Sequence, residues 1–184
     1  MSSRTIIPSL LGGLLLLSGT AFPLQAADVS SANIDAFNRQ RARLSALDAI
    51  SQAELYTMGD ILDVRFEVRD GRPDYLVHAD KEGQLITVLI DAMGLADPVS
   101  LDAKPERALT DERAAVAALP HSNLRFDDAI GAAERRLHGS TIEARLALRG
   151  GKPTVEVDIV RDAVLHTATI DPVLNTEGTV AESR

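Results

Sequence analysis

The sequence predicts an α+β protein made of two repeats, each a helix packed on a three-stranded antiparallel meander. Shifted by 80 residues, the segment 44–97 aligns with the segment 124–177 without a gap, and 16 of the 54 aligned positions are identical. Each copy opens with apolar residues at helical spacing and continues with three runs in which apolar and polar residues alternate. The first pattern is typical of an amphipathic helix, and the second is typical of half-buried strands.

The helix of each copy is predicted from one apolar stripe. The stripe consists of Ala46, Ala49, Ile50 and Ala53 in the first copy and of Phe126, Ala129, Ile130, Ala133 and Leu137 in the second. Ser45 with Asp48 predicts a capping box at the start of the first helix. The second copy has Arg125 at the Ser45 position, so its cap is weaker or lies at Asn123. A glycine, Gly59 or Gly139, follows each helix at the expected C-terminal position.

Three strands follow each helix. The alternating runs are residues 62–69, 75–79 and 85–90 in the first copy and 142–148, 155–159 and 165–170 in the second. Asp70-Gly71 and Gly150-Gly151 favour tight hairpin turns between the first two strands. Gly83 marks the next turn in the first copy. The second copy has Ala163 there and must use a different turn or accept strain.

Residues 1–26 have the layout of a cleaved secretory signal. An early cation, Arg4, precedes an apolar run at 10–17, and small residues precede a cleavage site after Ala26. A transmembrane anchor is the alternative, but a span needs about 20 apolar residues, and glycine, serine and proline interrupt this shorter run. The leader therefore predicts a periplasmic or secreted protein with no stable membrane anchor after cleavage.

Four segments are expected beyond the leader. Residues 27–97 hold the first repeat with an N-terminal helical extension, which could run into the repeat helix. Residues 98–123 form a linker with a short helix that starts at Thr110 and stops at Pro120. Residues 124–177 hold the second repeat, and residues 178–184 form a loose polar tail.

Composition excludes several classes of partner. The chain has no cysteine, a formal net charge of -8 and 3% aromatic residues. Without cysteine it can form neither disulfides nor a cysteine-linked lipid anchor. An acidic chain with few aromatic residues is poorly suited to phosphate backbones and base stacking, so no nucleic-acid partner is expected.

No catalytic, cofactor or metal site is predicted. The histidines share no metal-ligand spacing on one element; they are His78, His121, His138 and His166. His78 and His166 lie in predicted strands and could face each other if the two sheets meet. The loop that starts at Asp80 lacks the alternating ligands of a calcium loop and indicates a turn. Asp91 and Asp171 end strands and are expected to cap the turns that follow.

The candidate binding residues are Arg65, Arg69, Tyr75 and His78. Arg65 and Arg69 alternate with Asp63 and Glu67 along a charged strand face, and they recur as Arg145 and Arg149 in the second copy. Such a face is either solvated, with weak ion pairs, or a surface that binds a partner. An extended peptide could also add as a strand to an exposed sheet edge.

Both copies resemble the PepSY domain. The residues that carry the resemblance are Asp48-Ala49-Ile50, Gly71-Arg72-Pro73-Asp74-Tyr75 and Val88-Leu89-Ile90-Asp91 in the first copy, and Asp128-Ala129-Ile130, Gly151-Lys152-Pro153-Thr154-Val155 and Thr169-Ile170-Asp171 in the second. The second copy departs further, because Val155 replaces the family's aromatic residue and the glycine of the closing D-x-x-T-G is lost. The resemblance implies a non-catalytic domain that restrains or modulates peptidases outside the cytoplasm, and it brings no catalytic residues.

The sequence therefore predicts an exported, non-catalytic binding protein whose partner is a protein or peptide, and the resemblance implies a peptidase that it modulates or inhibits. Two alternatives stay open. One is an envelope module that binds a small molecule or metal, and the other is a structural subunit of an envelope complex.

Overall fold

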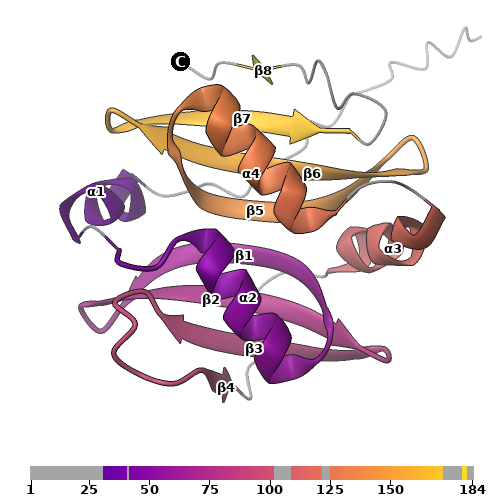
Figure 1. The fold of residues 1–184 in the computed structure, drawn as a ribbon, viewed down its shortest axis with the longest axis horizontal. Helices are drawn as coiled ribbons and strands as arrows, with labels where there is room; N and C mark the ends of the chain where they lie inside the picture. The colour runs from indigo at the N-terminus through magenta and orange to yellow at the C-terminus, as the bar shows by residue number, and fades with distance from the viewer. Residues whose placement is uncertain (1–30, 41, 102–108, 122–124, 172–179, 182–184) are drawn as a thin grey trace, which may run out of the picture.

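The computed structural model describes residues 31–40, 42–101, 109–121, 125–171 and 180–181. The predicted signal peptide, the Asn123 cap and the turn after Asp171 lie outside the described residues. Within the described part, the chain folds around a single antiparallel sheet of eight strands with helices packed on it, which confirms the α+β class (Figure 1). The strand order is β4-β3-β2-β1-β5-β6-β7-β8.

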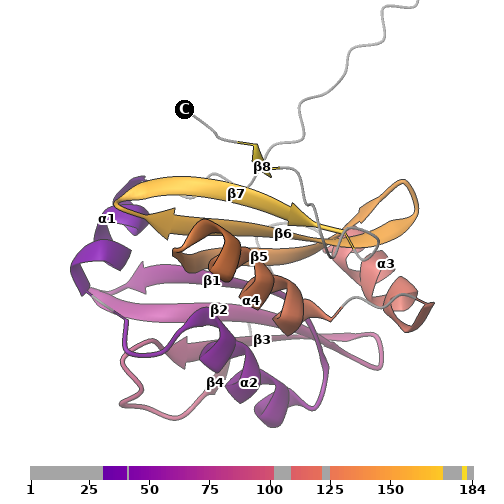
Figure 2. The same cartoon turned by 45° about the horizontal axis from the view of Figure 1, so that its top comes forward.

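The element order helix-strand-strand-strand occurs twice. The first unit, residues 46–91, consists of α2 (Ala46–Thr57), β1 (Asp60–Arg69), β2 (Arg72–Lys81) and β3 (Gln84–Asp91). The second unit, residues 126–170, consists of α4 (Phe126–Leu137), β5 (Ser140–Arg149), β6 (Lys152–Arg161) and β7 (Val164–Ile170). Both helices lie side by side across one face of the sheet, as Figures 1 and 2 show.

The two units share their sheet through β1 and β5. These strands pair antiparallel, with Val64 opposite Ala144. Because these residues are equivalent under the 80-residue shift, the pair marks a local two-fold axis between the units. The sequence left the packing of the copies open; the structure joins them edge to edge by backbone hydrogen bonds.

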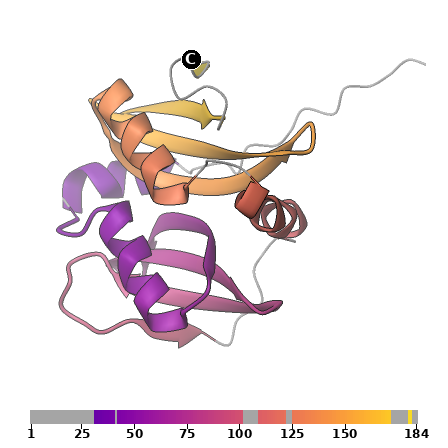
Figure 3. The ribbon, with the colours of Figure 1, turned by 45° about the vertical axis from the view of Figure 1, so that its right-hand side comes forward.

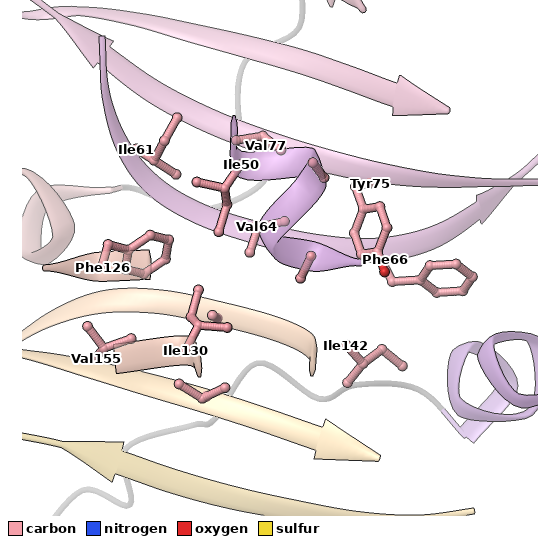
Figure 4. Close-up of a cluster of buried hydrophobic side chains, with 14 of the residues drawn as sticks. Ile50, Ile61, Val64, Phe66, Tyr75, Val77, Phe126, Ile130, Ile142 and Val155 are labelled. Carbon is pink, nitrogen blue, oxygen red and sulfur yellow. The ribbon is translucent and has the colours of Figure 1, made fainter. Parts of the chain in front are cut away.

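One apolar core lies between the sheet and the two helices (Figure 4). Ile50 of α2 and Ile130 of α4 are fully buried against apolar residues of the strands. Aromatic rings close one end, where Phe66 makes edge-to-face contacts with Phe37 and Tyr75 at centroid distances of 5.0 and 5.6 Å. Rings in this orientation add to the stabilisation that comes from burying their area.

The two units differ in the N-terminal caps of their helices. The predicted capping box is present: the Ser45 hydroxyl accepts from the Asp48 amide, and the Asp48 carboxylate accepts from the Ser45 amide at 2.8 Å. At α4, Arg125 makes no side-chain cap hydrogen bond. The first turn of α4 instead carries Asp127 and Asp128, whose charges favour the helix N-terminus.

The glycines after the helices have a different role from the one predicted. Met58 and His138, not the glycines, adopt the left-handed conformation at the C-caps, with φ of 55° and 53°. A Cβ at Gly59 would lie 2.8 Å from the Asp80 carbonyl oxygen, and one at Gly139 would lie 2.7 Å from the Val160 carbonyl oxygen. Glycine is therefore required by the close approach of the helix-to-strand turn to the neighbouring strand.

The second hairpins share one turn geometry. Glu82 and Gly83 have φ of 53° and 84°, and Asp162 and Ala163 have φ of 52° and 64°. The second unit thus keeps the turn and accepts the strain of a left-handed alanine, one of the two outcomes that the sequence allowed.

Elements outside the units cover the sheet's ends and edges. α1 (Ser31–Gln40) is separate from α2, so the predicted extension does not run into the repeat helix. α3 (Thr110–Ala118) and a 3-10 turn (Leu119–His121) form the predicted linker helix, and α3 lies on the other side of the sheet from α2 and α4 (Figure 3). Two short edge strands were not predicted: β4 (Val99–Leu101) within the linker, and β8 (Val180–Ala181) within the segment expected to be a loose tail.

Candidate functional site

The four candidate binding residues lie on opposite faces of the sheet. Tyr75 is buried in the core beneath the helices, whereas Arg65, Arg69 and His78 belong to the polar face. The reason is the two-residue period of a strand, which places Tyr75 and His78, three positions apart, on opposite sides. Tyr75 and His78 are only 1% and 7% exposed, so neither side chain is available on the surface of this structure.

The polar face carries buried acidic groups where the units meet. We call Asp63, His78, Glu143 and Asp158 the junction cluster. His78 Nδ1 lies 2.7 Å from an Asp63 carboxylate oxygen, and both side chains are buried. In the second unit the equivalent positions hold Glu143 and Asp158, which face each other across β5 and β6. The first unit therefore places a histidine beside its acid, and the second places two acids together.

Burial controls the charge of Glu143. The pKa of Glu143 is raised to about 7: loss of water contact is the largest cause and the charges of Asp158 and Asp63 add to it, while Arg65 opposes them. Burial also raises the pKa of Asp158, although the Thr167 hydroxyl donates to that carboxylate and lowers it. Two acids with raised pKa values in one buried place disfavour the state in which both are charged.

The arginines of the polar face are already paired. Arg65 and Arg69 contact Glu67 of their own strand at 3.5 and 3.4 Å. In the second unit Arg145 and Arg149 both donate to Glu156 of the neighbouring strand. Burial opposes ionisation there, but the two guanidinium groups hold the pKa of Glu156 below its usual value. These four arginines of the polar face therefore form ion pairs with acidic side chains of the same protein.

His78 and His166 do not face each other. They lie on β2 and β7, and β1, β5 and β6 separate these strands. At a spacing of about 4.8 Å per strand, the separation is roughly 19 Å. In the described ranges, no group of three histidine or acidic side chains is arranged to hold a metal ion.

A cleft of about 570 Å³ opens where the units meet near the helices. Its lining comes from α1, the α1–α2 connection, α2 and β2 on one side, and from α4, β5, the end of β6 and the turn after it on the other. We call it the inter-unit cleft. Its charged or hydroxyl-bearing lining residues include Arg43, Asp48, Tyr75, Glu134, Thr141 and Asp162.

Hydrogen bonds fix both walls of the cleft. The Tyr75 hydroxyl donates to the Leu44 carbonyl oxygen at 3.3 Å, and the Leu44 amide donates to the Ala92 carbonyl oxygen at 3.0 Å. On the opposite wall, the Thr141 amide donates to the Glu134 carboxylate at 2.9 Å. Burial raises the pKa of Tyr75, and the negative charges of Glu134 and Asp48 raise it further, so the tyrosine stays neutral.

Sequence reasoning missed this cleft. Its walls are up to about 120 positions apart in the chain, and only the pairing of β1 with β5 brings them together. One signal was present: Glu134 is identical to Glu54 under the 80-residue shift, on a helix position that is not part of the apolar stripe.

Comparisons with known proteins identify no family. No protein-family model matches the chain, and no curated protein matches it. A solved structure of a predicted lipoprotein from Clostridium difficile 630 is similar, with 20% identity and a TM-score of 0.38 over 76% of this chain and 91% of that chain. Across the part of the chain that the structure describes, no helix is both long enough and apolar enough to cross a membrane.

Proposed function

We propose that this protein is an exported, non-catalytic binding protein of two tandem PepSY-like units, and that it modulates or inhibits a peptidase in the cell envelope. The inter-unit cleft is the observation that carries the proposal. Its volume of about 570 Å³ falls within the range of about 300–1,000 Å³ that ligand sites occupy. A cleft with walls from both units also gives the duplication a use that a single unit could not supply.

The cleft is a better candidate than the sheet edges. Both outer edges end in short strands, because β4 pairs with β3 and β8 pairs with β7. Very short edge strands discourage the addition of another chain. Binding at the cleft leaves the edges unchanged and uses side chains from both halves of the protein.

The first test is capture of the partner. The protein carries a C-terminal tag, is crosslinked in its exporting cells, and is purified with whatever it contacts. We expect a peptidase among the crosslinked proteins and a fall in that peptidase's rate when purified protein is added. Capture of envelope proteins with no peptidase, and no effect on any co-exported peptidase, would overturn the modulator function.

A matched pair of variants locates the contact. Glu134→Gln changes the charge of the cleft but keeps an oxygen that can accept from the Thr141 amide. Glu54→Gln makes the same change at the equivalent position of the first unit, outside the cleft. Loss of the partner in the first variant and retention in the second would assign the contact to the inter-unit cleft.

A further inference from the structure

The charges that line the inter-unit cleft are mainly negative. Asp48, Glu134 and Asp162 contribute three carboxylates, and Arg43 is the only cation among the described lining residues. Asp48 and Glu134 both raise the pKa of the Tyr75 hydroxyl, so their charges act on the same point inside the cleft. A cation placed there would meet attraction from opposite walls, because Asp48 belongs to the first unit and Glu134 to the second.

A buried hydroxyl in the same cleft lacks a partner. Thr141 is 1% exposed and lines the cleft, and its Oγ1 atom makes no hydrogen bond. A buried polar atom without a partner costs roughly 1–3 kcal/mol. Valine has nearly the same shape and avoids that cost, so stability alone does not account for threonine at this position. A ligand that donates a hydrogen bond to Oγ1 would supply the missing partner.

The equivalent place on the other side of the two-fold axis has different uncharged side chains. There Phe126 replaces Ala46, Val155 replaces Tyr75, and Ile61 replaces Thr141. Phe126 is buried in the core beside Ile130 and Val155 (Figure 4). The counterpart keeps both carboxylates, as Asp128 and Glu54, but lacks the tyrosine and threonine hydroxyls. Of the two equivalent places, the inter-unit cleft alone combines the carboxylates with a buried hydroxyl.

We infer that the inter-unit cleft binds one cationic group per chain, the ammonium or guanidinium of a basic peptide side chain, between Asp48 and Glu134 with Thr141 Oγ1 as a further acceptor. An ammonium has three donors and no acceptor, which matches two carboxylates and one hydroxyl oxygen. This inference rests on the proposed binding function and names the chemistry of its site. A small polyamine would offer the same group, so the experiment separates the two sources.

Binding is measured by titration calorimetry and amide chemical shifts with three blocked pentapeptides, Ala-Ala-Xaa-Ala-Ala, in which Xaa is lysine, glutamine or glutamate. Spermidine forms a fourth arm. We expect the lysine peptide to bind at least about tenfold more tightly than the glutamine peptide, as a charge-assisted hydrogen bond allows, and to shift the amides of the cleft. Equal binding of the lysine and glutamine peptides would overturn the inference.

Two variants test the residues. Glu134→Gln should weaken lysine-peptide binding about tenfold, whereas Glu54→Gln should leave it unchanged. Thr141→Val should weaken it severalfold while leaving the melting temperature equal or higher, because it removes an unpartnered buried hydroxyl. A lower melting temperature with unchanged binding would show that Thr141 is only structural and would overturn its assigned role.

The result also separates this inference from the proposed function. If a captured peptidase binds equally to wild type and to Glu134→Gln, the cation site is overturned and the modulator function stands. If spermidine binds in the cleft and the lysine peptide does not, the cation site stands with a small amine as its ligand. That second result would count against a peptide partner at this cleft.

Discussion

The two units use one backbone for two sets of side chains. The turn geometries and the glycines at the close approaches are the same in both, since the neighbouring strand lies against Gly59 and Gly139 alike. The polar groups differ: Arg65 and Arg69 use an acid on their own strand, whereas Arg145 and Arg149 use Glu156 on the next strand. The two units therefore share their backbone constraints and differ in the partners of their side chains.

The solvent-facing ends of the two helices differ as well. α2 ends with three exposed apolar residues, Leu55, Tyr56 and Met58. The equivalent residues of α4 are Arg135, Arg136 and His138, which are exposed and basic. The two units therefore differ in the residues that they expose, although they share one core. Substitutions at equivalent positions test whether a structural feature contributes alike in both units or in only one.

The largest expected effect tests whether the units fold together. Ile50→Ala and Ile130→Ala each remove a fully buried side chain from equivalent helix positions. Each should lower the free energy of unfolding by about 3 kcal/mol, since large-to-small changes in a core cost roughly 2–5 kcal/mol. Urea denaturation followed by circular dichroism should show one shared transition for both variants, because β1 and β5 join the units in one sheet. Two separate transitions in either variant would contradict a single cooperative core.

The next prediction concerns the pH dependence of stability that the junction cluster causes. The pKa of Glu143 is raised from 4.5 to about 7, so the native state holds this proton more tightly than the unfolded chain does. Its contribution is therefore unfavourable at high pH: stability falls as the pH rises from about 4.5 to about 7. Glu143→Gln should leave stability nearly unchanged at pH 4 and raise it by up to about 3 kcal/mol at pH 8, measured by denaturation across that range.

The matched change in the first unit should act in the opposite direction. Asp63 occupies the position equivalent to Glu143, but it contacts His78 at 2.7 Å. Asp63→Asn weakens that buried hydrogen bond and should destabilise the protein by about 1 kcal/mol. If Asp63→Asn and Glu143→Gln changed the free energy of unfolding alike at pH 8, the Asp63–His78 pair and the Glu143–Asp158 pair would not have opposite effects on stability.

A further pair of substitutions compares the close approaches at Gly59 and Gly139. Gly139→Ala would bring a Cβ to 2.5 Å from Ile159 Cγ2 and 2.7 Å from the Val160 carbonyl oxygen. Gly59→Ala would bring one to 2.8 Å from the Asp80 carbonyl oxygen. Both should destabilise by about 1–3 kcal/mol, with the larger loss at Gly139, where a side chain and the backbone must both move. Thermal melts of the two variants give the order, and a larger loss at Gly59 would reverse it.

The smallest effect tests the strained turn. Ala163 holds a φ of 64°, whereas the equivalent residue of the first unit is a glycine. Ala163→Gly should raise the free energy of unfolding by about 0.5–1 kcal/mol, because glycine adopts this conformation without a steric penalty. Gly83→Ala should lower it by a similar amount. Differential scanning calorimetry resolves both, and a loss of stability in Ala163→Gly would show that the alanine methyl makes a compensating contact.

Much of the fold could be predicted from residues near one another in the chain. The Ser45–Asp48 box and the Asp91 turn, in which the carboxylate accepts from the Met93 and Leu95 amides, were predicted because their groups lie within four positions. The Asp80 turn is of the same kind, since its carboxylate accepts from the Gly83 amide. Such local hydrogen bonds compete well even before the rest of the chain has folded.

The candidate site was predicted less well. Arg65 and Arg69 were expected to form an exposed charged face, yet Arg65 is half-buried and both arginines are paired within the chain. Tyr75 and His78 were candidate binding residues as well; both are buried, and they lie on opposite faces. Side-chain alternation in the sequence already separates these two residues, whereas their burial depends on what covers the sheet.

The sequence by itself determined the repeated elements, the hairpin positions and the strand faces, because helix periodicity, glycine placement and alternation act over a few residues. Only the tertiary structure decided that the units share one sheet. The same long-range pairing of β1 with β5 set the three acids and the histidine of the junction cluster close together on one face and opened the inter-unit cleft near the helices. The physical reason is distance along the chain. Residues about 80 positions apart interact only after the backbone has folded, and no local pattern records which edges will then meet.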